Sequence, residues 1–286
     1  MNYNKLRKRH QSPRRQLPYI FRRIVVGLIA AGVVTLQTSC GFTPPVSLIP
    51  EVQGTALSPG FAYCPQFFAG GAVPLVPKVP KLRELCFDSF AVLHSGSSRT
   101  PVFAAERTNR QLLLQARDLK RTDRFFADAR LPQSERAEVS DYKNSGYARG
   151  HMAPAGNMAS STSMAQSFSL ANVVPQNPQQ NSGAWAKIET DTRSYVMRAV
   201  GDVYVLTGPI FGPINLTIGI NEVRVPTHLF KVVYDPATQK AWVHWQQNAA
   251  DARAGKPIRY SELVQRTGIE WLPGVTINEL DSSVLD

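Results

Sequence analysis

Alternation of apolar and polar residues marks several strands in this sequence. Residues 86–95 (CFDSFAVLHS) alternate, a Gly-Ser turn follows at 96–98, and residues 101–108 (PVFAAERT) read as the return strand of a β-hairpin. Further strand-like runs occupy residues 202–211, 222–235 and 240–247. Gly212-Pro213 and Asp235-Pro236 supply turn chemistry between these runs, so the second half of the chain predicts more sheet.

Helical composition lies between the two groups of strands. Residues 181–199 predict a helix, with Asn181 or Ser182 as its N-cap. Residues 133–139 predict a short helix or a polar turn. Strands at both ends with helices between them favour an α+β fold, in which helices flank an antiparallel sheet.

The first 39 residues have the layout of a signal peptide. A basic stretch ends at Arg23, residues 24–36 form an apolar run of 13 residues, and Thr38-Ser39-Cys40-Gly41 follows. The run is short for a membrane span. Its ending resembles a bacterial lipoprotein cleavage site, which would make Cys40 a lipidated N-terminus that holds the protein at a membrane. The alternatives are an uncleaved N-terminal anchor and secretion through cleavage elsewhere. We therefore expect export to a bacterial periplasm or cell envelope, lipid-anchored or secreted.

The mature chain reads as a tether followed by one domain. Residues 40–60 are rich in Pro, Gly and Ser without a period, which is typical of a flexible tether, and residues 61–286 hold the domain. An exported chain meets an oxidising compartment, so Cys64 and Cys86 predict a disulfide, worth roughly 3 kcal/mol in the chain-entropy model. The alternative is two buried free thiols.

The formal net charge of +11 belongs largely to the leader. Residues 1–39 hold eight basic residues and no acidic one, which leaves 24 basic and 21 acidic residues in the remainder. Overall basicity is therefore weak support for nucleic-acid binding, and such a function must depend on local arginines.

The segment with the clearest chemistry is Arg149-Gly150-His151-Met152-Ala153-Pro154. It sets a cation suited to phosphate beside a titratable base, with Gly150 allowing a sharp turn and Pro154 stopping a helix. Alone, this pattern is weak, because a single histidine is more often structural.

A second segment carries four residues spaced by four, which places them near one helix face. They are Asn181, Trp185, Glu189 and Arg193. The stripe offers an amide oxygen, a carboxylate and a guanidinium. By spacing alone, an amphipathic helix with a buried tryptophan and a surface Glu–Arg pair explains it better.

Taken together, the two segments resemble the DNA/RNA non-specific endonucleases of the ββα-metal (His-Me finger) superfamily, the Serratia-nuclease and endonuclease-G type. The matching positions are residues 149–154, Asn172, residues 181–185, Glu189 and Arg193, with Arg107 before the motif and residues 207–210 after the helix. The resemblance spans roughly residues 85–270. It implies a ββα-metal core on the antiparallel sheet and a metal-dependent endonuclease that hydrolyses DNA and RNA with little sequence preference.

The resemblance also implies roles at a metal. His151 would be the general base that activates water, and Asn181 the one protein ligand of the ion. Glu189 would hold a metal-bound water, and Asn172 would be a supporting active-site residue. Mg²⁺ keeps several waters and accepts few protein ligands, so a single amide oxygen suits it, with Mn²⁺ as a substitute.

Arg107, Arg149 and Arg193 would contact the phosphate, because the forked guanidinium matches phosphate geometry. One position departs from the family's Asp-Arg-Gly-His pattern, since Ala148 stands where the aspartate is usual. This departure keeps a second hypothesis open, an envelope-associated nucleic-acid-binding or DNA-uptake component with weak or no cleavage. A third, less favoured, is a structural lipoprotein.

Overall fold

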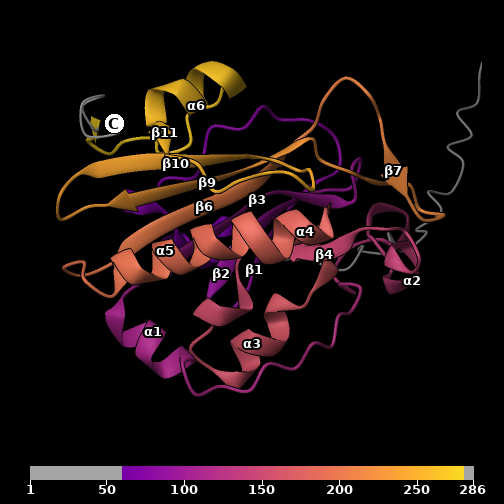
Figure 1. Cartoon of the computed structure of the whole chain (residues 1–286), viewed down its shortest axis with the longest axis horizontal. Helices are drawn as coiled ribbons and strands as arrows, with labels where there is room; N and C mark the ends of the chain where they lie inside the picture. The colour runs from indigo at the N-terminus through magenta and orange to yellow at the C-terminus, as the bar shows by residue number, and fades with distance from the viewer. Residues whose placement is uncertain (1–59, 280–286) are drawn as a thin grey trace, which may run out of the picture. The chain divides into compact units, whose positions relative to one another are not determined.

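The computed structural model describes residues 60–279, which form an α+β unit built on one antiparallel sheet (Figure 1). Within these residues the sheet has eight strands in the order β1-β2-β3-β6-β9-β10-β11, with β12 parallel to β10. The strands are β1 (Leu82–Cys86), β2 (Phe90–Ser95), β3 (Thr100–Thr108), β6 (Val203–Ile210), β9 (His228–Asp235), β10 (Lys240–Gln247), β11 (Ile258–Arg259) and β12 (Asn278–Glu279). The predicted hairpin is β2–β3, and the runs predicted after the helix contain β6, β9 and β10.

Two smaller strand pairs lie outside this sheet. They are β4 (Ala148–His151) with β5 (Val173–Gln176), and β7 (Thr217–Ile218) with β8 (Val223–Arg224). The helices are α1 (Arg110–Ala116), α2 (Val139–Tyr142), α3 (Ser161–Ser167), α4 (Pro178–Gln180), α5 (Ala186–Val196) and α6 (Tyr260–Thr267). The β4–β5 pair runs directly into α4, because only Asn177 separates β5 from the helix.

The far face of the sheet packs against the N-terminal arm and α6. Phe103 and Ala105 of β3 point to this side. They join a core that contains Phe68 of the arm, Leu263 of α6 and Trp271. The arm consists of three short 3-10 turns, η1 (Phe61–Tyr63), η2 (Pro65–Phe67) and η3 (Ala69–Gly71). This core lies on the sheet face opposite to the one that packs against α5 and the β4–β5 pair.

A disulfide pins the arm to β1. Cys64 and Cys86 are bonded to one another, with their Cα atoms 5.9 Å apart. The bond lies on the side of the far-face core, because Cys64 is buried in that core and Cys86 packs against it. The irregular arm at residues 65–80 thus gains a covalent anchor that its few hydrogen bonds do not supply.

The near face of the sheet packs against the helices and the β4–β5 pair. Ala104 of β3 and Leu229 of β9 join a core with Met152, Phe168 and Trp185. In Figure 1 the helix α4–α5 runs along this face, and α1 and α3 lie beyond it on the same side. The segment around residue 151 and the helix after residue 178 therefore share one side of the sheet.

The helix predicted over residues 181–199 begins earlier than predicted. Its N-cap is Asn177, whose Oδ1 accepts from the backbone N–H groups of Gln179 and Gln180. The expected N-caps Asn181 and Ser182 instead lie within a π-helical turn, η7 (Asn181–Trp185), that joins α4 to α5. The expectation was wrong because Pro178 is tolerated at the first helical position, where no N–H is needed.

The expected signal peptide (residues 1–39), most of the tether (residues 40–60) and Cys40 lie outside the described residues. In residues 60–279 no helix is long and apolar enough to span a bilayer. The segment predicted as a short helix or turn, residues 133–139, contains the 3-10 turn η4 (Gln133–Glu135) and the start of α2.

Candidate active site

The β4–β5 pair presents Arg149 and His151 on one face of a short strand. His151 is opposite Val173 and Ala148 is opposite Gln176. Because side chains alternate along a strand, Arg149 and His151 point to the same side and Gly150 lies between them on the other. A Cβ at Gly150 would lie 1.8 Å from Oε1 of the buried Gln176. Glycine is therefore required here by the close approach of Gln176, and not by its backbone angles.

His151 is a buried, neutral imidazole with a free nitrogen. Its side chain is 8% exposed, and its ring packs edge-on to Phe168 at 4.9 Å and against Phe125 at 5.3 Å between centroids. Burial lowers the pKa of His151 to about 3, helped by the charges of Arg121 and Arg149 and opposed by Asp123. Its Nε2 has no hydrogen-bond partner among the described residues. An imidazole in this state is unprotonated at neutral pH.

The Arg149 guanidinium is held by an aromatic ring and not by a carboxylate. Its Cζ lies 4.3 Å from the centroid of Phe125, a cation–π contact. No carboxylate of residues 60–279 forms an ion pair with it. Its charge is thus available to an anion beside His151.

The π-helical turn sets the direction of the helix residues. Within residues 60–279 the Asn181 side chain has no hydrogen-bond partner, because Asn177 does the capping. A step of four residues falls short of a full turn in a π-helix and overshoots it in an α-helix. The angular drift around the helix axis therefore has opposite signs in the two steps. The π-helical step from Asn181 to Trp185 offsets the α-helical step from Trp185 to Glu189, so Asn181 and Glu189 lie near the same face of the helix. Turns of this kind recur at functional sites.

Glu189 is half-buried among cations. Burial raises the pKa of its carboxyl group, and the positive charges of Lys231, Arg193 and Arg121 oppose that shift. Arg121 also lowers the pKa of His151, so its charge acts on both groups. Arg193 donates to Thr190 Oγ1 at 3.1 Å and makes no ion pair within the described part of the chain.

A buried charge cluster lies beneath Glu189, and the sequence analysis did not find it. Lys231 of β9 is 1% exposed, donates to Thr207 Oγ1 at 2.7 Å and lies 5.3 Å from the Trp185 ring. Glu106 of β3 accepts from Asn157 at 3.1 Å, and burial raises the pKa of Glu106 to about 7. The sequence feature that could have indicated this cluster is Lys231, a lysine whose neighbours along the strand are apolar.

Arg107, which the resemblance implies as a phosphate contact, lies on the far face of the sheet. Glu106 points to the near face, where the charge of Glu189 acts on it, so its neighbour Arg107 points to the far face. There it pairs with Asp202 at 3.1 Å. The structure therefore does not bring Arg107 onto the sheet face that carries Glu106 and Glu189. The arginine found beside His151 is Arg121, which stacks on Phe168 at 5.1 Å.

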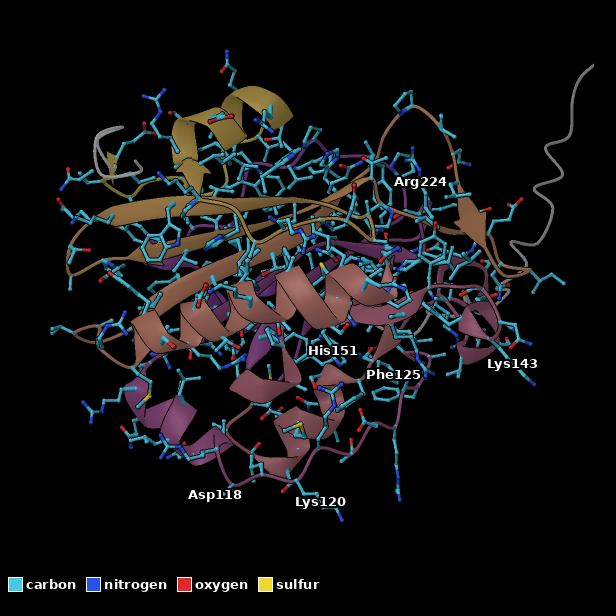
Figure 2. The ribbon with its side chains drawn as sticks, viewed as in Figure 1. Asp118, Lys120, Phe125, Lys143, His151 and Arg224 are labelled. Atoms are coloured by element: carbon cyan, nitrogen blue, oxygen red, sulfur yellow. A yellow bond between two sulfur atoms is a disulfide. The ribbon has the colours of Figure 1, made fainter. Side chains whose placement is uncertain are left out.

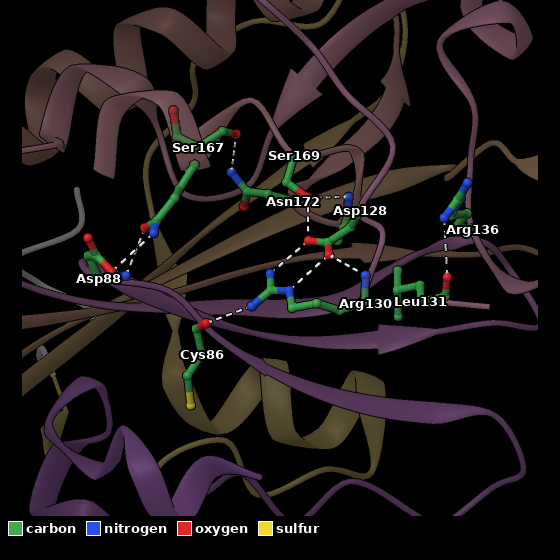
Figure 3. Close-up of polar contacts among 11 residues, drawn as sticks. Cys86, Asp88, Asp128, Arg130, Leu131, Arg136, Ser167, Ser169 and Asn172 are labelled. Atoms are coloured by element: carbon green, nitrogen blue, oxygen red, sulfur yellow. Dashed lines mark hydrogen bonds and ion pairs between the residues drawn. The ribbon is translucent and has the colours of Figure 1, made fainter. Parts of the chain in front are cut away.

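Asn172 positions the loop after His151 and has no amide atom left for substrate. Its Oδ1 accepts from Ala153 N at 2.9 Å, and its Nδ2 donates to the carbonyls of Ala153 and Ser167 at 2.9 and 3.0 Å. Figure 3 shows the bond to Ser167 beside a second support, in which the Asp128 carboxylate accepts from Ser169 and pairs with Arg130. Asn172 is thus a positioning residue.

Two short antiparallel strands that carry a histidine, followed at once by a helix with an unused amide and a carboxylate, define the ββα-metal class of nuclease folds. The model of the DNA/RNA non-specific endonuclease family matches residues 76–276. The chain belongs to this family.

Similar proteins agree with this assignment. The mitochondrial nuclease EXOG of Danio rerio is 36% identical over 159 residues, covering 51% of this chain and 46% of that protein. Nuclease C1 of Cunninghamella echinulata var. echinulata is 31% identical over 215 residues, covering 69% and 84%. The EndoG/EndoGI complex structure matches with a TM-score of 0.62 and 25% identity, over 71% of this chain and 89% of the matched one.

The chain spans about half the length of the curated relatives first matched. Those relatives, together with human endonuclease G and a nuclease of Schizosaccharomyces pombe, are named as mitochondrial proteins. This contradicts the export to a bacterial periplasm or cell envelope that the leader led us to expect, and that expectation is withdrawn.

Proposed function

We propose that this chain is a Mg²⁺-dependent endonuclease that hydrolyses phosphodiester bonds of DNA and RNA, with His151 as general base. The observation that carries the proposal is the buried, neutral His151 ring with an unpartnered nitrogen, two residues from an arginine without a carboxylate partner. Family membership and the name of the matched family support the two substrates.

The residues present fit a hydrated divalent ion. The Asn181 amide is uncommitted within residues 60–279, and in this part of the chain no three His, Cys, Asp or Glu side chains are grouped to hold a metal. A hard cation that keeps most of its waters suits one amide oxygen and a nearby carboxylate, which Glu189 supplies. Such an ion, Mg²⁺ or Mn²⁺, would contribute charge stabilisation of the phosphate and of the leaving oxygen.

The chain's own residues account for the other requirements of an in-line displacement. We expect the His151 ring to accept the proton of the attacking water and Arg149 and Arg193 to bind phosphate oxygens, while Asn181 and Glu189 would hold the ion and its water. The low pKa of His151 leaves it unprotonated in the resting enzyme. The same burial makes it a weak base, and a phosphate anion bound beside it would raise its pKa toward neutrality.

The test is cleavage of plasmid DNA and of RNA by purified protein, with Mg²⁺ and with EDTA. We expect cleavage of both substrates with Mg²⁺ and none with EDTA. The His151→Ala variant should lose about 10²–10⁴-fold in rate, the usual contribution of a general base. His228→Ala is the matched control, because His228 lies on β9 and packs on Trp245. Salt-sensitive binding of DNA without any cleavage would support the binding-component hypothesis instead.

A further inference from the structure

A pocket of about 470 Å³ opens beside Arg149, between the segment before residue 126 and the loop after α2. Its lining includes Arg121, Phe125, Tyr142, Lys143, Tyr147 and Arg149. Figure 2 shows Phe125 between His151 and Lys143 in that view. The volume lies within the range of small-ligand pockets, and the mechanism above does not use this space.

The pocket has aromatic walls and a cationic rim. Phe125 and Tyr147 are half-buried, so part of each ring stays accessible. Lys143 is exposed and has no carboxylate partner in residues 60–279, and Arg149 has none either. The third cation, Arg121, pairs with Asp123 at 2.6 Å. Aromatic faces combined with cations are what single-stranded nucleic acid binds, through base stacking and phosphate contacts.

The buried side of the pocket holds a polar group without a partner. Tyr142 is 6% exposed, and its hydroxyl forms no hydrogen bond with any described residue. Burial raises the pKa of this hydroxyl, so it stays protonated and can donate. Tyr142 therefore forms part of the pocket wall, and its hydroxyl is enclosed by protein and not presented to the cavity.

Phe125 joins the pocket to the proposed active site. The same ring stacks on Arg149 at 4.3 Å and packs against His151 at 5.3 Å. A phosphate held by Arg149 beside His151 would therefore leave the adjoining nucleoside at the mouth of the pocket. We propose that this pocket is a subsite for the base of an unstacked nucleotide next to the scissile phosphate, in single-stranded DNA or RNA. The proposal rests on the proposed function.

Stacking is tolerant of base identity, so the subsite is compatible with low sequence preference. It favours substrates whose bases are already unstacked, because extracting a base from a duplex costs free energy. Ala148 also lines the pocket, and an aspartate there would bring a negative charge toward the phosphate. The departure from the family pattern thus makes the pocket more suited to an anionic nucleotide.

The test measures binding without metal, so that nothing is cleaved. The full chain is titrated in EDTA against a labelled ten-nucleotide oligothymidylate and against an abasic strand with the same phosphates. We expect the oligothymidylate to bind about tenfold more tightly, because stacking contributes about 1–3 kcal/mol per base. Tyr147→Leu should remove most of this difference. Tyr63→Leu is the matched control, since Tyr63 is 71% exposed on the arm.

Two further variants separate the hydroxyl and the charge. Tyr142→Phe should leave the binding of both strands unchanged, because the hydroxyl that it removes is enclosed by protein. Ala148→Asp should weaken binding of both strands, whereas Ala148→Asn should not.

Equal affinity of the wild type for the two strands, or equal effects of Tyr147→Leu and Tyr63→Leu, would overturn the subsite. Cleavage in Mg²⁺ is measured in parallel. If plasmid is cleaved but the base preference is absent, only the subsite fails. If the base preference is present and no cleavage occurs, the proposed function fails.

Discussion

At the scale of single residues, the site depends on how buried charges set the protonation of their neighbours. Lys231 opposes the upward shift that burial gives the pKa of Glu189. Removing the lysine charge should raise that pKa further, so the Glu189 carboxylate would form only at higher pH. Lys231 also opposes the upward shift that burial gives the pKa of Glu106. Lys231 thus favours the ionised form of both carboxyl groups.

The Lys231→Met variant tests this. We expect the acid limb of its rate profile to move to higher pH, with rate lost near neutrality and partly recovered as the pH rises. Lys240→Met is the control, because Lys240 is an exposed residue at the start of β10. A uniform loss of rate at every pH would show that Lys231 matters for packing alone.

Sequence reasoning reached some of these residues and missed others for physical reasons. The stripe Asn181, Glu189 and Arg193 was recognisable, because helix residues spaced by four share a face. The sheet face on which Arg107 lies could not be predicted, because the burial of both sheet faces hides the alternation that decides it. Glu106 and Lys231 carry no local signal of their pairing, since β3 and β9 are not even neighbours in the sheet.

At the scale of elements, the β4–β5 pair depends on the close contact of Gly150 with Gln176. Gly150→Ala would place a Cβ 1.8 Å from Gln176 Oε1, so the strand must shift and move His151 with it. We expect about 1–3 kcal/mol of lost stability together with a large loss of rate. Gly183→Ala is the matched control, because nothing lies within 4 Å of its added methyl group. Denaturant unfolding of both variants decides it, and equal stability would contradict the account.

The pair was expected only through the ββα-metal core that the resemblance implies, and no strand pattern in the sequence indicated it. Each strand has four residues, and one contains Pro175, so neither shows the alternation of a longer strand. The helix after it was predicted, but its start was misplaced because Pro178 occupies the first helical position and Asn177 caps it. By contrast, the long strands β2, β3, β6, β9 and β10 have enough residues for their pattern to be readable.

At the scale of the whole molecule, the disulfide and the proposed active site lie on opposite faces of the sheet. Replacing Cys64 and Cys86 with alanine should lower the free energy of unfolding by roughly 3 kcal/mol in the chain-entropy model. Cleavage below the melting temperature should be unchanged, because the arm contacts the far-face core. Thermal unfolding with and without a thiol reductant measures the first effect. Loss of activity on reduction of a still-folded protein would contradict this separation.

The central claim is that the amide of Asn181 and the imidazole of His151 act on one hydrated divalent ion and its water. The most direct test is the rate of plasmid cleavage by Asn181→Ala across a Mg²⁺ titration. Ser182→Ala is the control, because the Ser182 hydroxyl donates to the Pro178 carbonyl. We predict that Asn181→Ala loses about 100-fold in rate and needs more Mg²⁺, as expected when a charge-stabilising group is removed. Wild-type rates and Mg²⁺ dependence in Asn181→Ala would contradict the account.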